Sequence, residues 1–266
     1  MASLKKYYAY TRLSILTGTA FRWQVIWGFI TGIFIMVFNI FLWSSVYANK
    51  PEIGGMSLNE MLNYFLLVQI VSMITSTRID REISREIMRG EILNRLIRPL
   101  NIYIQGFFTH LGSVVWNLLL SGLPILIVSL FIINVTLPRN ISIFFVFSLS
   151  ILLGLLISYN INFLAGITAA WVRGSEGITH AKDFLVVICA GSILPLSFYP
   201  SVLQDIFKYL PFKFIISVPL NIYLGKTNEA DYYKLIVEGI VWILLLCFLN
   251  AFLYKKAFKK IMVYGG

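Results

Sequence analysis

Long apolar runs separated by short polar segments dominate the pattern of this chain. A helix needs about 20 apolar residues to cross the roughly 30 Å hydrocarbon core of a bilayer. Six stretches meet or approach that length and predict six transmembrane helices: Trp23–Tyr47, Leu58–Thr77, Ile104–Ile133, Ile141–Trp171, Phe184–Tyr199 and Leu235–Tyr254. The third is expected to kink at Pro124, and the fifth is the shortest.

The basic residues gather in alternate connecting segments. Sixteen of the 22 Lys and Arg residues lie in residues 1–22, 78–98, 172–183 and 255–260. The positive-inside rule places these segments in the cytoplasm, so both chain ends are expected there. No cleavage site follows the first apolar run, which therefore predicts a span rather than a cleaved signal peptide.

The composition agrees with a membrane protein. Hydrophobic residues make up 58% and charged residues 13%, against about 45–50% and about 25% in soluble domains. These values exclude a soluble enzyme, a disulfide scaffold and a disordered chain. The predicted fold class is all-α, a polytopic membrane protein with one transmembrane domain over residues 1–266. The net charge of +10 lies mostly in the basic loops, which favours contact with membrane lipids and no nucleic-acid partner.

Residues 1–22 predict an interfacial helix along the inner membrane surface. Basic side chains would meet anionic headgroups there, and the apolar side would consist of Leu4, Tyr7, Tyr8, Ile15 and Leu16. A solvated basic tail is the alternative interpretation.

Residues 78–98 contain ten of the chain's 34 charged side chains. An apolar stripe predicts an amphipathic helix that bends near Gly90 and ends before Pro99. The stripe consists of Ile79, Ile83, Ile87, Leu93, Leu96 and Ile97. Four pairs are spaced for ion pairs along a helix: Arg78–Glu82, Glu82–Arg85, Glu86–Arg89 and Glu91–Arg95. The apolar face needs the membrane surface or a second protein, and we favour a protein. A solvated connecting loop is the alternative.

Prolines divide residues 191–225 into apolar pieces too short to span the membrane. They are Pro195, Pro200, Pro211 and Pro219. Irregular backbone is tolerated at membrane depth only against protein or a wet cavity. We therefore expect a re-entrant or interfacial hairpin on the outer side, before the last span. An ordinary outer loop with an interfacial helix is the alternative.

A search for chemistry finds no catalytic pattern. Gly225–Lys226 is the one Gly-Lys pair, and Leu220 stands where a phosphate-binding loop needs its first glycine. The other candidates have no partner at catalytic or metal-ligand spacing: His110, His180, Cys189, Cys247 and Glu238. We expect no catalytic residue, no metal site and no cofactor on this chain.

Amide side chains recur within the predicted spans: Asn39, Asn63, Gln69, Asn117, Asn160 and Asn162. In hydrocarbon such groups usually hydrogen-bond to neighbouring helices. The second interpretation is that Asn39, Asn63, Gln69, Asn160 and Asn162 line a cavity on a substrate route.

The whole arrangement resembles the membrane-spanning subunits of type 2 ABC exporters. Two stretches carry the likeness to a bacterial permease subgroup often described as antibiotic or multidrug exporters. The first runs from Arg89-Gly90-Glu91-Ile92 to Leu96-Ile97-Arg98-Pro99-Leu100-Asn101. The second combines Gly191-Ser192, Pro195-Leu196, Phe198-Tyr199-Pro200 and Leu210-Pro211-Phe212.

The resemblance implies roles that composition does not. Residues 78–98 would be a coupling helix docking into a cytoplasmic ATPase subunit, with Arg78, Arg81, Glu82, Arg85, Glu86, Arg89 and Glu91 as contacts. An outer gate would include Pro195, Pro200, Leu210, Pro211 and Phe212. Two permease subunits, identical or homologous, would pair with two ATPase copies that bind ATP and Mg in a bacterial inner membrane.

The expected function is that of a permease moving an amphipathic or lipid-like substrate (an antibiotic, peptide or lipid) by alternating access. Two alternatives belong to other classes. A non-transporting assembly or immunity factor would use the inner helix for docking alone. A membrane-embedded lipid-modifying enzyme would need a cluster of acids or histidines, which the sequence does not offer.

Overall fold

The computed structural model describes residues 2–18, 22–96, 100–138, 140–172 and 176–264. Most of them are helical, as the apolar pattern predicts. The α-helices are α1 (Ala2–Gly18), α2 (Arg22–Val46), α3 (Leu58–Thr75), α4 (Ile79–Met88), α5 (Ile92–Leu96), α6 (Ile102–Asn117), α7 (Leu123–Ile132), α8 (Ile141–Ile167), α9 (Glu176–Cys189), α10 (Ser201–Lys208), α11 (Ser217–Tyr223) and α12 (Tyr232–Tyr264). A small antiparallel hairpin of β1 (Glu52–Ile53) and β2 (Met56–Ser57) departs from the all-α expectation.

Five helical stretches of the described chain are long and apolar enough to cross a membrane. They are Ile26–Val46, Leu58–Met88, Ile102–Ile132, Ile141–Ala170 and Glu229–Lys260. These correspond to the predicted spans one to four and six. The predicted fifth span, Phe184–Tyr199, has the wrong bounds, because α9 begins at Glu176 and ends at Cys189 after 14 residues.

A glycine ends α9 earlier than the apolar pattern suggested. Gly191 has a φ of +84°, a conformation that L side chains rarely adopt. Its N–H donates to the Ile188 carbonyl, and the Ser192 N–H donates to the Val187 carbonyl. These two bonds form a Schellman motif, which satisfies the last carbonyls of a helix and reverses the chain.

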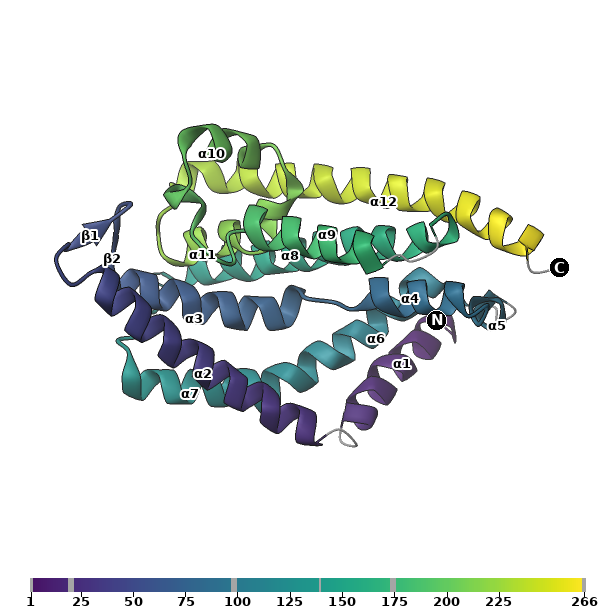
Figure 1. The fold of residues 1–266 in the computed structure, drawn as a ribbon, viewed down its shortest axis with the longest axis horizontal. Coiled ribbons are helices and arrows are strands. Elements are labelled where there is room, and N and C mark those ends of the chain that lie inside the picture. Colours follow the sequence, from purple (N-terminus) through teal and green to yellow (C-terminus); the bar gives the residue numbers. More distant parts are fainter. Residues whose placement is uncertain (1, 19–21, 97–99, 139, 173–175, 265–266) are drawn as a thin grey trace.

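Helices α3, α8 and α12 run side by side along the molecule, and the shorter α9 lies beside α8 (Figure 1). The β-hairpin, α10 and α11 lie toward one end, and α4, α5 and both termini lie toward the other. Two of the apolar clusters hold these two ends together. The cluster at the hairpin end includes Tyr64, Phe214 and Leu220, and the cluster at the α4 end includes Ile83 and Phe163.

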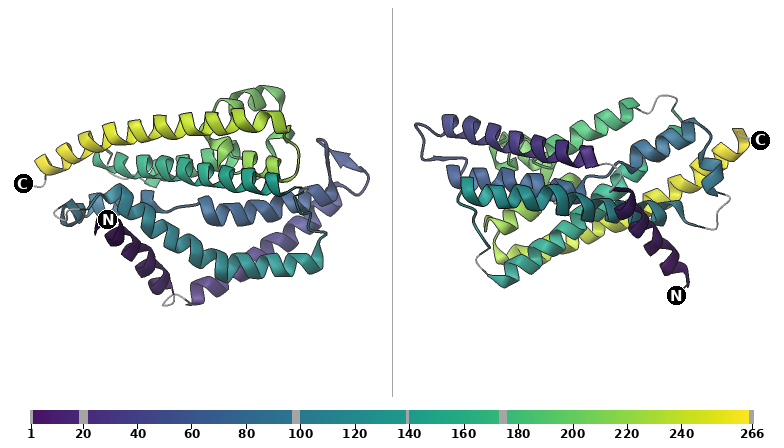
Figure 2. Two further views of the ribbon diagram at one scale, coloured as in Figure 1. Left: turned by 180° about the vertical axis from the view of Figure 1, so that it is seen from behind. Right: turned by 90° about the horizontal axis from the view of Figure 1, so that it is seen from below.

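The third span bends just before Pro124. Residues Leu118–Gly122 form a π-helical turn between α6 and α7, and the two helices meet at an angle in the views of Figures 1 and 2. Proline lacks an amide hydrogen and its ring crowds the preceding turn, so a helix accommodates it by widening or bending. The predicted kink is therefore present, centred on the turn before the proline.

Helix α1 packs against protein on one side, a contact that the sequence did not indicate. Tyr7 is buried and stacks on Phe108 of α6, with ring centroids 5.8 Å apart. Thr11 donates a 2.8 Å hydrogen bond to the Phe108 carbonyl. Gly112 permits this close approach, because a Cβ there would lie 2.5 Å from the Thr11 carbonyl oxygen. Tyr8 and Leu16 remain exposed, as an interfacial helix requires.

Residues 211–223 lie inside the bundle rather than over it. Phe214, Ile215 and Leu220 are at most 3% exposed and belong to the apolar cluster of the hairpin end. Gly154 of α8 lets this segment approach, since a Cβ there would lie 2.4 Å from the Phe214 carbonyl oxygen. In contrast, α10 exposes Val202 and Ile206. Residues 191–225 thus contain an exposed amphipathic helix, α10, followed by a buried segment that runs back into the bundle.

Candidate coupling site

Helix α4 turns its apolar face into the chain itself. Ile79 and Ile83 are at most 4% exposed and pack with Tyr159, Phe163 and other residues of the α4-end cluster. The prediction that this face covers a separate protein was therefore wrong for α4. Ile97 lies outside the described residues, and the Leu96 side chain is likewise undescribed.

The opposite side of α4 and the turn after it are exposed. Within the described residues these positions carry mostly charged side chains: Arg78, Arg81, Glu82, Arg85, Arg89 and Glu91. Gly90 has a φ of +74° and ends α4, so the bend expected near this residue is present. The result is a charged surface on a short helix whose back is fixed in the bundle.

Arg95 ties α5 back onto α4. Its guanidinium lies 3.0 Å from a Glu82 carboxylate oxygen and 2.9 Å from a Glu86 carboxylate oxygen. None of the four ion pairs predicted along the helix occurs among the described residues, because the turn at Gly90 brings Arg95 across to α4. Burial alone would lower the pKa of Arg95, but Glu86 and Glu82 outweigh that effect and raise it.

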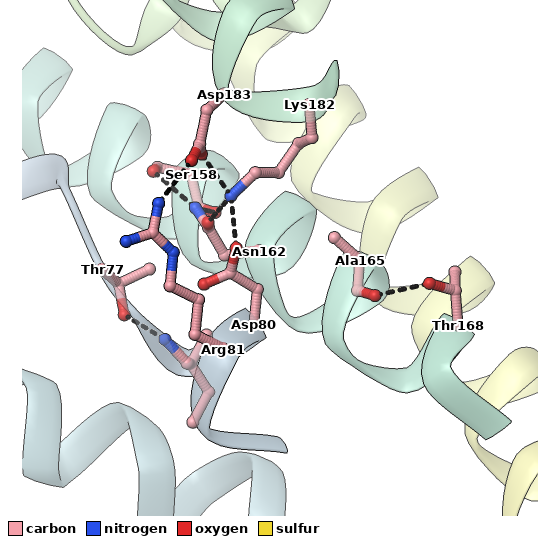
Figure 3. A network of polar contacts seen from close by, with 10 residues as sticks. Thr77, Asp80, Arg81, Ser158, Asn162, Ala165, Thr168, Lys182 and Asp183 are labelled. Carbon is pink, nitrogen blue, oxygen red and sulfur yellow. Dashed lines mark hydrogen bonds and ion pairs between the residues drawn. The ribbon is translucent and has the colours of Figure 1, made fainter. Parts of the chain in front are cut away.

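A second network joins α4 to α9 (Figure 3). Lys182 Nζ lies 2.7 Å from Asp80 Oδ2 and 2.8 Å from Asp183 Oδ1. Arg81 donates a 2.9 Å hydrogen bond to Asp183 Oδ2. Burial raises the pKa of Asp183, but hydrogen bonds and charge from Lys182 and Arg81 prevail and hold it below its ordinary value. Two adjacent residues of α4 thus contact two adjacent residues of α9.

Helix α8 completes this network from a third side. Lys182 also donates a hydrogen bond to Asn162 Oδ1. The Asn162 amide in turn donates a 2.8 Å hydrogen bond to the Ser158 carbonyl. Gly166 lies directly under α4, since a Cβ there would lie 3.0 Å from both the Cα and the carbonyl oxygen of Asp80. We call Asp80, Arg81, Asn162, Lys182 and Asp183 the inner charge network.

Asp80 and Lys182 were missed as functional candidates. The available signal was position: Asp80 lies between Ile79 and Ile83 on the buried side of α4, together with Ser84. An acid on an apolar face needs a buried cation. The sequence could not tell which of the basic residues supplies it, because Lys182 is about a hundred residues away along the chain.

Three amide residues of the spans join chain segments, whereas Asn39, Gln69 and Asn117 line cavities. Asn63 is buried, donates to Asn134 and accepts from the Thr136 amide. Asn160 is buried and accepts hydrogen bonds from Tyr103 and Asn250. Both tie chain segments together, as does Asn162.

Asn39 and Gln69 line a cavity of about 10 Å³ between α2, α3 and the end of α7. Gln69 also donates to the Gly32 carbonyl at 3.3 Å. A cavity of that volume is about large enough for one water molecule. It therefore does not form a route for a larger molecule in this conformation.

The predicted gate residues begin the short helices of residues 191–225. Pro195 precedes a 3-10 turn, Pro200 precedes α10, and Leu210 precedes the 3-10 turn Pro211–Phe214. Pro195 and Pro211 are buried, Phe212 is half-buried, and Pro200 is exposed.

A cavity of about 1090 Å³ adjoins these short helices. Four of its lining residues are lysines: Lys208, Lys213, Lys226 and Lys234. Lys213 pairs with Glu238 at 2.6 Å, so this acid of the last span has a specific partner. The gate function of the region stays a prediction.

No three His, Cys, Asp or Glu side chains of the described chain gather where they could hold a metal ion. The arrangement offers a mechanical support: the charged surface of α4 is held by a buried ion pair to α9 and by close packing against α8.

A bundle of apolar helices with a charged helix pair between the second and third spans defines a polytopic membrane protein. The family described as ABC-2 family transporter protein matches residues 33–265. The chain belongs to this family and is a multi-pass membrane permease of an ABC transporter. Permeases of this kind work with an ABC ATPase. No curated protein matches the chain in a sequence search.

Proposed function

We propose that this chain is the permease of a bacterial exporter in which α4 and α5 receive the movement of the ATPase. One observation carries the proposal: the charged side of α4 is exposed, while its opposite side is anchored to α8 and α9 through the inner charge network. A helix that only connected two spans would need neither a buried ion pair to α9 nor close backbone packing against α8.

Movement would pass through this support because its parts are short and well packed. Asp80 and Lys182 are 2% and 10% exposed, and Gly166 brings the α4 backbone against α8. Buried pairs of this kind tolerate little separation, since a separated ion would remain in a poorly solvating interior. A displacement of α4 would therefore carry α8 and α9 with it.

The substrate would be an amphipathic or lipid-like molecule, moved outward by alternating access. Two permeases, identical or homologous, would combine with two ATPase copies that hold ATP and Mg. ATP can change the orientation of the spans only through a difference in free energy between two states. In this scheme the difference arises at the ATPase and reaches the spans through α4.

The location of the charges supports a cytoplasmic position for this end. Residues 78–98 carry six Arg, and residues 255–260 near the end of α12 carry four Lys. The described members of both groups lie toward the end of the molecule where the termini are (Figure 1). By the positive-inside rule, this end would face the cytoplasmic side of the inner membrane.

The test reverses two exposed charges: Arg85 has no ion pair in the described chain, and Arg89 has only an exposed one to Glu91. Arg85→Glu with Arg89→Glu should reduce co-purification of the ATPase at least tenfold and abolish its stimulation by the permease. Glu86 is a poor choice, because its reversal would break the pair with Arg95. Lys50→Glu, at an exposed residue near the β-hairpin, is the matched control.

Thermal unfolding of the purified variants separates docking from folding. An unchanged midpoint with lost ATPase binding supports the proposal. Normal binding and normal ATPase stimulation by the charge-reversed protein would overturn the assignment of α4. If α4 docks a protein that hydrolyses no ATP, the assembly-factor alternative replaces the exporter.

A further inference from the structure

A polar cavity of about 530 Å³ lies beside the junction of α3 and α4. It is distinct from the inner charge network, with which it shares no residue. Its walls come from α1, α2, the end of α3, α6 and the π-helical turn. The lining residues are Ser14, Thr17, Gly18, Gly28, Ser72, Met73, Ser76, Thr77, Arg78, His110, Ser113, Trp116, Asn117 and Ser121.

The chemistry of these walls is unusual for helices of a membrane span. Seven lining residues are Ser or Thr, none is acidic, and Arg78 is the one charged residue among them. Arg78 forms no ion pair with any described residue. Its guanidinium can therefore offer several N–H donors to an anion, which it recognises well when the anion is a phosphate.

Several other donors in the cavity are unused. Ser72, Ser76, Asn117 and Ser121 have no side-chain hydrogen bond within the described part of the chain. The indole nitrogen of Trp116 is buried without an acceptor there. Polar groups at membrane depth usually find partners, and unpartnered ones mark functional sites.

The position of the cavity favours a ligand that reaches it from the membrane. Gly28, Ser72 and Ser121 all lie within stretches apolar enough to span. Arg78 immediately precedes α4, Thr17 lies in the last turn of α1, and both are exposed. Near its α2 wall, Trp23 and Trp27 are 76% and 65% exposed, and exposed Trp residues are typical of the membrane interface.

We propose that this cavity binds the phosphate-bearing headgroup of a lipid amphiphile from the cytoplasmic leaflet, with Arg78 contacting the phosphate and the serine hydroxyls supporting it. The acyl chains extend along the apolar exposed surface of α2. The claim that this lipid is the transported substrate rests on the proposed function. The claim that the cavity binds the lipid rests on the cavity alone.

The test measures binding of radiolabelled phosphatidylglycerol to the permease purified with its ATPase in detergent. Arg78→Gln should weaken binding at least tenfold, and Arg78→Lys should restore part of it. Arg12→Gln is the matched control, because Arg12 is an exposed cation of α1 outside the cavity. Equal weakening by the two Gln variants would reveal general surface attraction and overturn the proposal.

A second variant blocks the cavity while keeping its charge. A Cβ at Gly28 would meet only the Ser121 hydroxyl, at 3.5 Å, so Gly28→Leu fills space without a backbone clash. It should weaken lipid binding at least tenfold, whereas Thr31→Leu on the exposed side of α2 should not. Unchanged binding to Gly28→Leu would overturn the location, even if Arg78→Gln fails to fold.

Competitors identify the source of the phosphate. Unlabelled phosphatidylglycerol should displace the label, while diacylglycerol, which lacks a phosphate, should not. Displacement by millimolar inorganic phosphate as complete as that by the lipid would assign the cavity to a soluble anion instead. ATP hydrolysis by the same complex is followed in parallel. If the complex hydrolyses ATP but neither variant weakens lipid binding, the lipid site is overturned and the proposed function is not. If lipid binding depends on Arg78 but the complex hydrolyses no ATP, the proposed function is overturned and the lipid site is not.

Discussion

Lys182 Nζ lies 2.7 Å from Asp80 Oδ2, and the two side chains are 10% and 2% exposed. The pair connects α4 to α9 across about a hundred residues of chain. One oxygen of Asp80 has no hydrogen-bond partner in the described chain. Lys182 is therefore the cation that compensates the buried Asp80 carboxylate, which makes the pair a sensitive point of the fold.

Removing one partner should destabilise the protein far more than removing both. Lys182→Met leaves a buried carboxylate without its cation, which costs about 3–5 kcal/mol of unfolding free energy. Asp80→Asn combined with Lys182→Met should recover most of that loss. Lys208→Met is the control, because its pair with Asp205 is exposed and should leave the unfolding midpoint unchanged. An equal loss of unfolding free energy in the single and double variants would contradict the compensation of Asp80 by Lys182.

Two glycine substitutions should change stability in opposite directions. Gly→Ala in a helix normally gains about 1 kcal/mol in helix propensity. Gly177→Ala should show that gain in part, since a Cβ there meets nothing within 4 Å. Gly166→Ala should instead destabilise the protein and weaken ATPase stimulation, because its Cβ would lie 3.0 Å from the Asp80 backbone. Thermal unfolding and ATPase rates check both, and stabilisation by Gly166→Ala would show that α4 moves freely over α8.

Two glycines with positive φ, Gly191 at the end of α9 and Gly225, allow the cost of backbone strain to be separated from the cost of a steric contact. Gly191→Ala and Gly225→Ala both place a Cβ on a residue with positive φ, at about 1–2 kcal/mol each. At Gly225 the Cβ meets nothing within 4 Å, whereas at Gly191 it lies 2.8 Å from the Tyr64 hydroxyl. That hydroxyl donates a 2.7 Å hydrogen bond to the Gly191 carbonyl. Gly191→Ala should therefore lower the unfolding midpoint further, and equal midpoints would argue against the Tyr64 contact.

Loss of Arg95 should release α5 without unfolding the spans. Arg95→Gln removes both ion pairs to Glu82 and Glu86. Amide hydrogen exchange in Ile92–Leu96 should then speed up at least tenfold, while exchange in α8 stays slow. Arg89→Gln is the control, since Arg89 is exposed and lies 3.9 Å from Glu91. Equal exchange in wild type and Arg95→Gln would show that other contacts hold α5.

The contribution of Asp183 should disappear in acid. Its pKa is lowered in the folded protein by Lys182 and Arg81, against the opposing effect of burial. Stabilisation of this sign is fully present above the ordinary carboxyl pKa, about 4, and is lost as the pH falls through the lower folded-state value. The difference in unfolding midpoint between wild type and Asp183→Asn should therefore be constant from pH 7 to 5 and shrink toward pH 3. A constant difference down to pH 3 would contradict the lowered pKa.

Apolar length and charge were sufficient to predict most helices. Four long spans, the last span and the bend at Gly90 follow from local properties of the chain. The end of α9 was predicted wrongly because apolarity continues past it. There the positive φ of Gly191 and its Schellman bonds decide the boundary, and a hydropathy pattern does not contain that information.

The apolar stripe of α4 shows a different limit. The sequence established that Ile79 and Ile83 share a face that must be covered, and burial of apolar surface gives the reason. It could not establish what covers them, because lipid, a second protein and the chain's own α8 offer equally apolar surfaces. The tertiary structure assigns them to the cluster with Tyr159 and Phe163.

The sequence alone therefore determined a mostly helical membrane protein with a charged helix between its second and third spans, because hydrophobicity and helical periodicity are local. The tertiary structure decided which charges meet. Asp80 pairs with Lys182, Arg95 pairs with two acids of α4, and Arg78 has no partner in the described chain beside a polar cavity. Such pairings depend on distances between segments far apart along the chain, and only packing of the helices fixes those distances.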